Sequence, residues 1–337
     1  MPDGFEPAYV YARVCGSLAR SFLGDKAAAL AMSHRVGEAW RAIFGEAPPA
    51  LPEAELATAA ERGVRARAIE ALRAIAGPLL KNEPFFAALA RKWEFGYLKN
   101  ALAGVVERSP EAPALEDPRL EPSFDARSYP DLDRMLRGTR YHWILESGLD
   151  DLTAVKNRLD RQYYSELWDS VKTIPAGLVG TIPELLRAEA ELGNLAWSLR
   201  LKRYYSLDAA DIEGLLIGLE GADVKSPALR ALGLNADSRS DWVGWKWEGL
   251  VPDGRREDGG DWHFDVRGFE SAARRYMYRR LYRRLHLEIE SYVPLYSYFR
   301  IKEFETTALH GTIEGIKLEA PAAEIGAFAA ETTGGRK

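Results

Sequence analysis

Residues 94–102, EFGYLKNAL, carry a pattern that returns at residues 191–199, ELGNLAWSL, and at residues 305–313, ETTALHGTI. Each copy has an acid followed by apolar residues four and eight positions later. Because an α-helix turns once in about 3.6 residues, these three positions share one helix face. The pattern predicts three related helical units rather than one enzyme pocket. The simpler alternative is three unrelated amphipathic helices.

The rest of the chain also has helical periodicity, and we find no strand alternation of useful length. The predicted fold class is therefore all-α. Five prolines interrupt the helical pattern between residues 109 and 130, which favours a domain boundary there. We predict three similar helical domains with approximate threefold symmetry, over residues 1–122, 123–213 and 214–337.

Two segments of the third predicted domain depart from the helical pattern. Residues 235–264 are rich in Gly, Asp and Trp, and we predict that they are irregular. Their tryptophans are too numerous for a solvated linker, so they are expected to pack on a neighbouring surface of the chain or on a partner. The tail after Pro321 is rich in Ala, Thr and Gly and is predicted to fray.

The composition limits the classes of protein to consider. The chain has 337 residues, 47% hydrophobic and 28% charged, which is typical of a soluble globular protein. No apolar run approaches the roughly 18–20 residues of a membrane helix, and the first residues do not resemble a signal peptide. The single cysteine, Cys15, fits a reducing cytosol. A formal net charge of −5 disfavours nucleic acid as a partner. Any membrane association is therefore expected to be peripheral.

The sequence lacks the common catalytic motifs. It has no P-loop, no Gly-x-Gly-x-x-Gly, no His-Glu-x-x-His and no Gly-x-Ser-x-Gly. The five histidines are far apart and lack the spacing of metal ligands, so we expect no metal and no cofactor. Three pairs of glutamates stand two residues apart, beginning at Glu189, Glu288 and Glu303. Such positions diverge on a helix, so we expect one acid of each pair to face solvent and the other a neighbouring helix.

Residues 274–284, RRYMYRRLYRR, contain six arginines and no acid. Their spacing predicts a basic stripe along a helix, beside an apolar one. Three interpretations are open: a solvated face whose side chains cover apolar surface, a contact with an acidic protein partner, or nucleic-acid binding. The acidic balance of the chain disfavours the last. Arg279 and Arg283 are the candidate partner-contact residues.

Three elements of the chain, taken in order, resemble a known family. They are YVYARV at residues 9–14, ELGNLAWSLR at residues 191–200 and YFRIKEFE at residues 298–305. The chain resembles the C-type component of the V-type and archaeal-type rotary ATPases, the counterpart of the d-type component in the eukaryotic vacuolar enzyme. After the last acid of the third element, Ala308-Leu309 replaces the family's usual Asn-Leu.

The resemblance implies a non-catalytic rotor component: three helical domains forming a funnel between the central shaft and the membrane proteolipid ring. Its expected partners are the D-type and F-type shaft subunits and that ring, on the cytoplasmic side and without insertion into lipid. Glu94, Glu191 and Glu305 are then expected to be structural anchors of the socket rather than catalytic acids. The rival interpretation is a helical-repeat adaptor or scaffold unrelated to the ATPase. Solenoid repeats recur about every 34–45 residues, whereas these copies are much further apart.

Overall fold

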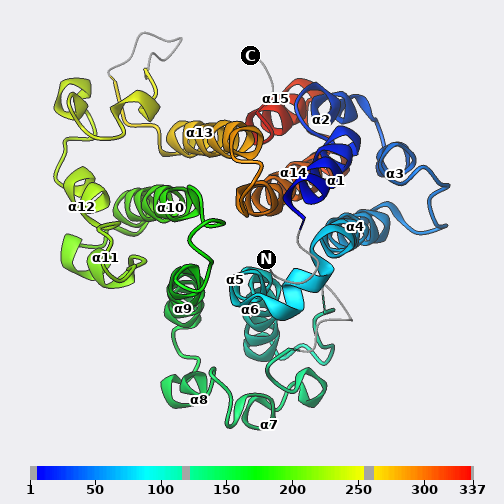
Figure 1. Ribbon diagram of the computed structural model, residues 1–337, viewed down its shortest axis with the longest axis horizontal. Helices are drawn as coiled ribbons and strands as arrows, with labels where there is room; N and C mark the ends of the chain where they lie inside the picture. Colours follow the sequence, from blue (N-terminus) through cyan, green and yellow to red (C-terminus); the bar gives the residue numbers. More distant parts are fainter. Residues whose placement is uncertain (1–5, 116–121, 254–261, 335–337) are drawn as a thin grey trace.

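The computed structural model describes residues 6–115, 122–253 and 262–334. Within these ranges the regular structure is helical and contains no β-strand, which confirms the all-α fold class. Figure 1 shows many of the helices nearly end-on, gathered around a middle that α5, α9, α10 and α14 approach from different sides. The helices are α1 Pro7–Arg20, α2 Asp25–Ala29, α3 Val36–Phe44, α4 Glu53–Asn82, α5 Pro84–Ala90, α6 Lys92–Val106, α7 Leu132–Leu136, α8 Trp143–Ser147, α9 Leu152–Val171, α10 Ile182–Tyr205, α11 Ala209–Leu215, α12 Ser226–Leu232, α13 Val266–Leu287, α14 Val293–Lys317 and α15 Ala322–Thr332.

Helix α14 contributes more buried residues than any other helix among the described residues. Every residue from Ser291 to Ile301 is buried, including Arg300. The helix packs against α1, α4, α13 and α15. Pro294 lies in its first turn, where a missing backbone N–H costs no hydrogen bond. Segments from both ends of the sequence therefore share one helix as their support.

The second group of contacts centres on α10 and α9. Helix α10 packs against α9, α11, α12 and α13, while α9 also contacts α5 and α6. Asp208 caps the N-terminus of α11 by accepting a hydrogen bond from the backbone N–H of Asp211, at 2.8 Å. One large apolar cluster contains residues from all three predicted domain ranges. The threefold division of the chain therefore stays a prediction.

The segment after Pro321 forms helix α15, so the prediction that the tail frays is wrong as far as Thr332. Two glycines of α14 explain why the helices approach so closely. A Cβ built at Gly311 would overlap the ring of Phe328, and one at Gly315 would lie 2.8 Å from Cγ1 of Ile325. The large side chains of the tail, Phe328 and Ile325, therefore pack directly over glycines of α14. The backbone N–H of Gly24 donates to Oγ1 of Thr333 at 2.9 Å, which joins the end of α15 to the start of α2.

The Trp-rich stretch is irregular where it is described, apart from two short 3₁₀ turns, Arg239–Trp242 and Glu248–Leu250. Its indole rings are largely turned into the protein: Trp242, Trp245 and Trp247 are buried. The Trp242 ring stacks on Phe264, with ring centroids 4.2 Å apart. These side chains pack against their own chain, as one of the two interpretations predicted.

Candidate interaction surfaces and a buried polar hub

Glu305, in the middle of α14, binds the N-terminal segment. Its side chain accepts a hydrogen bond from the backbone N–H of Phe22 at 2.7 Å and forms an ion pair with Lys302. The residue is only 5% exposed. Phe22 follows the end of α1, so this carboxylate satisfies a backbone donor in the turn between α1 and α2.

Glu191, in the middle of α10, binds the Trp-rich stretch. Nζ of Lys246 lies 2.7 and 2.6 Å from its two carboxylate oxygens, and Nε1 of Trp247 donates to Oε2 at 3.2 Å. The acid is 5% exposed. A buried carboxylate needs such donors to remain ionised at low cost.

Glu94 occupies a different position, in the first turn of α6, and it is half-buried. It accepts hydrogen bonds from the backbone N–H of Ser123, at 3.3 Å, and from the Ser123 hydroxyl. The three acids thus bind three separate segments, each distant from the acid in the sequence. In all three cases, an acid on a helix contacts a segment that is not helical.

A buried polar hub connects α6, α9, α10 and α14. In it, Nε of Arg300 lies 3.0 Å from Oε2 of Glu189, and Nη1 of Arg300 lies 3.0 Å from Oε2 of Glu303. Lys92 extends this series of charges, with Nζ 2.8 Å from Oε1 of Glu303. Two tyrosines, Tyr164 and Tyr296, donate to Glu189 at 2.7 and 3.1 Å. We call these six residues the polar hub: Lys92, Tyr164, Glu189, Tyr296, Arg300 and Glu303.

The surroundings of the hub shift the pKa of its charged groups. Burial lowers the pKa of Arg300, but Glu189, Tyr163, Glu303 and Tyr296 together outweigh it, so that its pKa is raised well above the usual value. Burial raises the pKa of Glu303, but Lys92 and Arg300 outweigh it and leave that pKa lowered. Both groups therefore remain charged over the physiological range. Burial, with the charge of Glu189, raises the pKa of Tyr296 well above its usual value, which keeps the phenol protonated as a donor.

The hub corrects one sequence-based expectation. In two of the three glutamate pairs, both acids make internal contacts: Glu189 with Glu191, and Glu303 with Glu305. Their helices are surrounded on more than one side, so side chains that diverge still meet protein. Only the third pair, which begins at Glu288, includes an exposed acid. The Glu-x-Glu spacing was the signal in the sequence that pointed to these acids. No local pattern identified Arg300 as the partner that Glu189 and Glu303 share.

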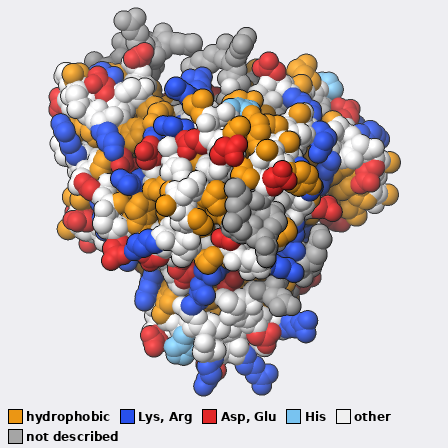
Figure 2. Space-filling model, viewed as in Figure 1, with side chains coloured by type: hydrophobic (Ala, Val, Ile, Leu, Met, Phe, Trp, Pro, Cys, Tyr) orange, Lys and Arg blue, Asp and Glu red, His pale blue; other side chains and the backbone are white. Residues whose placement is uncertain are grey.

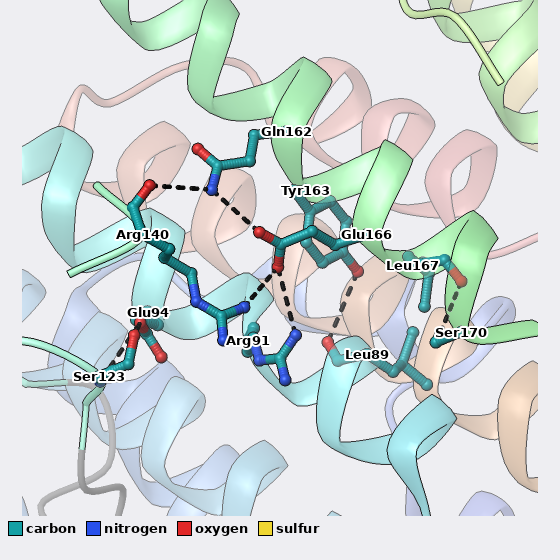
Figure 3. A network of polar contacts seen from close by, with 10 residues as sticks. All are labelled: Leu89, Arg91, Glu94, Ser123, Arg140, Gln162, Tyr163, Glu166, Leu167 and Ser170. Atoms are coloured by element: carbon teal, nitrogen blue, oxygen red, sulfur yellow. Dashed lines mark hydrogen bonds and ion pairs between the residues drawn. The ribbon is translucent and has the colours of Figure 1, made fainter. Parts of the chain in front are cut away.

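A second polar network, drawn in Figure 3, joins the α5–α6 junction to α9. Oε2 of Glu166 on α9 lies 3.2 Å from Nη1 of Arg91 and 2.8 Å from Nη1 of Arg140. Gln162, one turn earlier, donates to the other oxygen of Glu166 at 2.9 Å. The two arginines approach the same carboxylate from different segments, which fixes the short helices around residues 132–147 against α9.

The arginine stripe of α13 divides into two groups. Arg279 and Arg283 are exposed, and within the described ranges they have no ion pair or hydrogen-bonding partner. The helix also exposes Tyr282 beside them. Figure 2 shows cationic and anionic side chains interspersed over the face seen in Figure 1. The other four arginines have internal partners: Arg274 with Ser271, Arg275 with Glu331, Arg280 with Glu184 and Arg284 with Glu288.

Two other kinds of feature are absent from the part of the chain that the structure describes. No group of three or more His, Cys, Asp or Glu side chains there is arranged to hold a metal ion. No helix in the same ranges is both long and apolar enough to cross a membrane.

Comparison with known proteins places this architecture in a family. A protein of Treponema pallidum (strain Nichols), described as uncharacterized, is 24% identical over 315 residues, which cover 91% of this chain and 92% of that protein. The sequence model of the ATP synthase (C/AC39) subunit family matches residues 52–328, which include the polar hub and all three repeat copies. The chain therefore belongs to the ATP synthase (C/AC39) subunit family.

Proposed function

We propose that this chain is the non-catalytic central-stalk subunit of a rotary V-type or A-type ATPase. It acts as a socket that joins D-type and F-type shaft subunits to the membrane proteolipid ring, and so couples ATP chemistry to proton or sodium transport. It is attached peripherally on the cytoplasmic side, through protein contacts and without insertion into lipid. The family match supports a role as an ATPase subunit.

The observation that carries this proposal is the polar hub. A part that transmits torque must resist shear between its helices, and apolar contacts alone permit sliding. Arg300 holds two carboxylates at fixed geometry, one on α10 and one on its own helix, and Lys92 extends the series of charges to α6. These ion pairs, together with the hydrogen bonds from Tyr164 and Tyr296 to Glu189, tie the four helices to one another.

Glu94, Glu191 and Glu305 fit the same role as structural anchors. Each binds a segment outside its own helix, and two of them are buried. In the proposed socket they hold the irregular segments against the helical body. The proposal includes three helical domains with approximate threefold symmetry, whose repeat copies supply these acids.

Arg279 and Arg283 are the proposed contact with an acidic partner. Arg275, Arg280 and Arg284 of the same helix form ion pairs within the chain, whereas these two exposed cations form none among the described residues. The side chains are therefore available to carboxylates of another subunit. Stable assemblies of this kind commonly bury more than about 2,000 Å², so the two arginines would form one part of a larger interface.

Co-purification from native membranes tests the proposal. The tagged chain is isolated from detergent-solubilised membranes, with an unrelated tagged soluble protein as the control. We expect the catalytic subunits, the shaft subunits and the proteolipid to be recovered with the chain and not with the control. Recovery of the chain without any ATPase subunit would contradict the proposal and favour an unrelated helical adaptor.

A further inference from the structure

A cavity of about 440 Å³ lies between α10, α13 and α14. Its volume falls within the range of about 300–1,000 Å³ typical of small-molecule sites. Part of its lining is apolar and includes Leu192, Met277, Leu281 and Phe304. Gly193 also lines the cavity, and a Cβ at that position would meet no heavy atom within 4 Å. The cavity therefore combines open space with an apolar surface.

The charged part of the lining carries more cations than acids. Four basic side chains line it, against three carboxylates, which leaves one positive charge in excess. All three carboxylates are engaged: Glu270 by Arg200, Glu189 by Arg300, and Glu303 by Arg300 and Lys92. The lining cations are Lys92, Arg200, Arg274 and Arg300.

Two of these guanidinium groups have unused donors. Nη2 of Arg300 and Nε of Arg274 are buried and make no hydrogen bond to any residue that the structure describes. Arg300 is only 2% exposed. The one hydrogen bond found for Arg274 joins its Nη2 to the hydroxyl of Ser271, at 3.4 Å. Buried donors without acceptors are costly, so the cavity favours a ligand that brings an acceptor.

Electrostatics at Arg274 agree with this geometry. Burial lowers the pKa of Arg274 below its usual value, and the nearby acids Glu270 and Glu331 offset only part of that effect. Its positive charge is therefore incompletely compensated by the protein. An anion bound in the cavity would supply the missing compensation.

We propose that this cavity binds a small monoanionic carboxylate with an apolar body, such as a medium-chain fatty acid. The single negative charge matches the excess charge of the lining. A planar carboxylate suits the fork of guanidinium donors, and the alkyl chain lies against Leu192, Met277 and Phe304. This site is independent of the proposed rotor function, because it requires no partner subunit.

Ligand-observed NMR titration of the purified full chain tests the proposal, with butyrate, hexanoate, octanoate and 1-octanol as probes. Octanoate is expected to bind, and affinity should fall about fourfold for each methylene removed. Octanol, which has the same chain without the charge, should bind at least tenfold more weakly. Equal affinity for octanol, no dependence on chain length, or no binding of octanoate at low millimolar concentration would each overturn the proposal.

Two variants locate the site, each with a matched control. Arg274→Gln should weaken octanoate binding at least tenfold, while Arg279→Gln, on the exposed part of the same helix, should leave it unchanged.

Gly193→Leu should block binding by filling the cavity. Gly77→Leu, at a helical position in α4 where a Cβ also meets nothing, should not. If Arg274→Gln does not fold, the glycine pair decides the result. Octanoate binding that survives Gly193→Leu would contradict the proposed location.

Discussion

Arg300 of α14 and Glu189 of α10 meet in the interior, with Nε of the arginine 3.0 Å from Oε2 of the glutamate. The arginine is 2% exposed and has a second carboxylate, Glu303, at the same distance. Two acids therefore depend on one buried cation. Such an arrangement adds little net stability over an apolar core, but it makes the removal of one partner costly.

Replacing Arg300 with methionine should lower the free energy of unfolding by about 3–5 kcal/mol, because Glu189 and Glu303 would lose their shared cation. The double variant Arg300→Met/Glu189→Gln should recover part of this loss by removing one uncompensated charge. Urea denaturation measures both. Arg283→Met, at an exposed position, serves as the control and should change the free energy by less than about 0.5 kcal/mol. Equal effects of Arg300→Met and Arg283→Met would contradict the role of the hub.

The three repeat acids should rank by their burial and contacts. Glu191→Ala and Glu305→Ala should each cost about 2–3 kcal/mol, because each leaves buried donors unsatisfied. Glu94→Ala should cost about 1 kcal/mol, since Glu94 is half-buried and water can replace it. Glu290→Ala, at an exposed acid, provides the baseline. Urea denaturation measures the loss of unfolding free energy in each variant. Equal losses in all four variants would show that the repeat acids are not anchors.

Stability should depend on the protonation of His310. Burial, helped by the charge of Arg65, lowers the pKa of this imidazole from 6.5 to about 4. As the pH falls below 6.5, the unfolded chain takes up the proton first, so folding loses stability between pH 6.5 and about 4. The loss should be about 1–2 kcal/mol, because the side chain is partly exposed.

His310→Gln should remove this part of the pH dependence while it keeps an N–H donor for the backbone carbonyl of Glu61, which lies 3.1 Å from Nε2 of His310. The test compares unfolding free energies of the two proteins at pH 7 and pH 4.5. His34→Gln, at an exposed position, is the control. Parallel pH profiles for wild type and His310→Gln would refute the assignment.

Glycines at two helical positions should respond in opposite ways to alanine. Gly311→Ala should destabilise the protein by about 1–3 kcal/mol, because the new methyl group overlaps the ring of Phe328. Gly16→Ala, in α1 where a Cβ meets nothing within 4 Å, should stabilise it by about 0.5–1 kcal/mol through helix propensity. Thermal unfolding distinguishes the two signs. Stabilisation by both substitutions would mean that α15 does not pack closely on α14.

Reversing the charges of Arg279 and Arg283 should disrupt a complex without unfolding the chain. Both side chains are exposed, so Arg279→Glu/Arg283→Glu should change the midpoint of thermal unfolding little. Recovery of ATPase subunits with the tagged chain should fall severalfold, because like charges would oppose the partner's acids. Arg134→Glu/Arg137→Glu, on the distant α7 segment, controls for net charge. Undiminished recovery with the α13 variant would exclude these residues from the interface.

The helices could be predicted from the sequence wherever periodicity was sustained. The helix expected at the third repeat copy is α14. Arg300 could not be identified, because its burial depends on Glu189, which lies on another helix. Nothing within YFRIKEFE separates that arginine from an exposed one.

The failed predictions share a physical cause. The tail after Pro321 has a composition typical of flexible segments, yet its Phe328 and Ile325 side chains pack against Gly311 and Gly315 of α14. Likewise, the expectation of one solvent-facing acid in each glutamate pair assumed that a helix has an exposed face. Such outcomes depend on tertiary contacts that no local pattern encodes.

The joining of early and late segments has a consequence for biosynthesis. The hydroxyl of Ser17 pairs with that of Tyr298 at 2.6 Å, and the Phe22 and Gly24 amides donate to Glu305 and Thr333. On the ribosome, helix α1 and the turn after it therefore emerge long before the residues that receive them. Although α1 and α3 can pack on α4 earlier, the contacts with α14 and α15 form only after those helices leave the exit tunnel, so a nascent chain stalled before Tyr298 would be a substrate for chaperones and proteases.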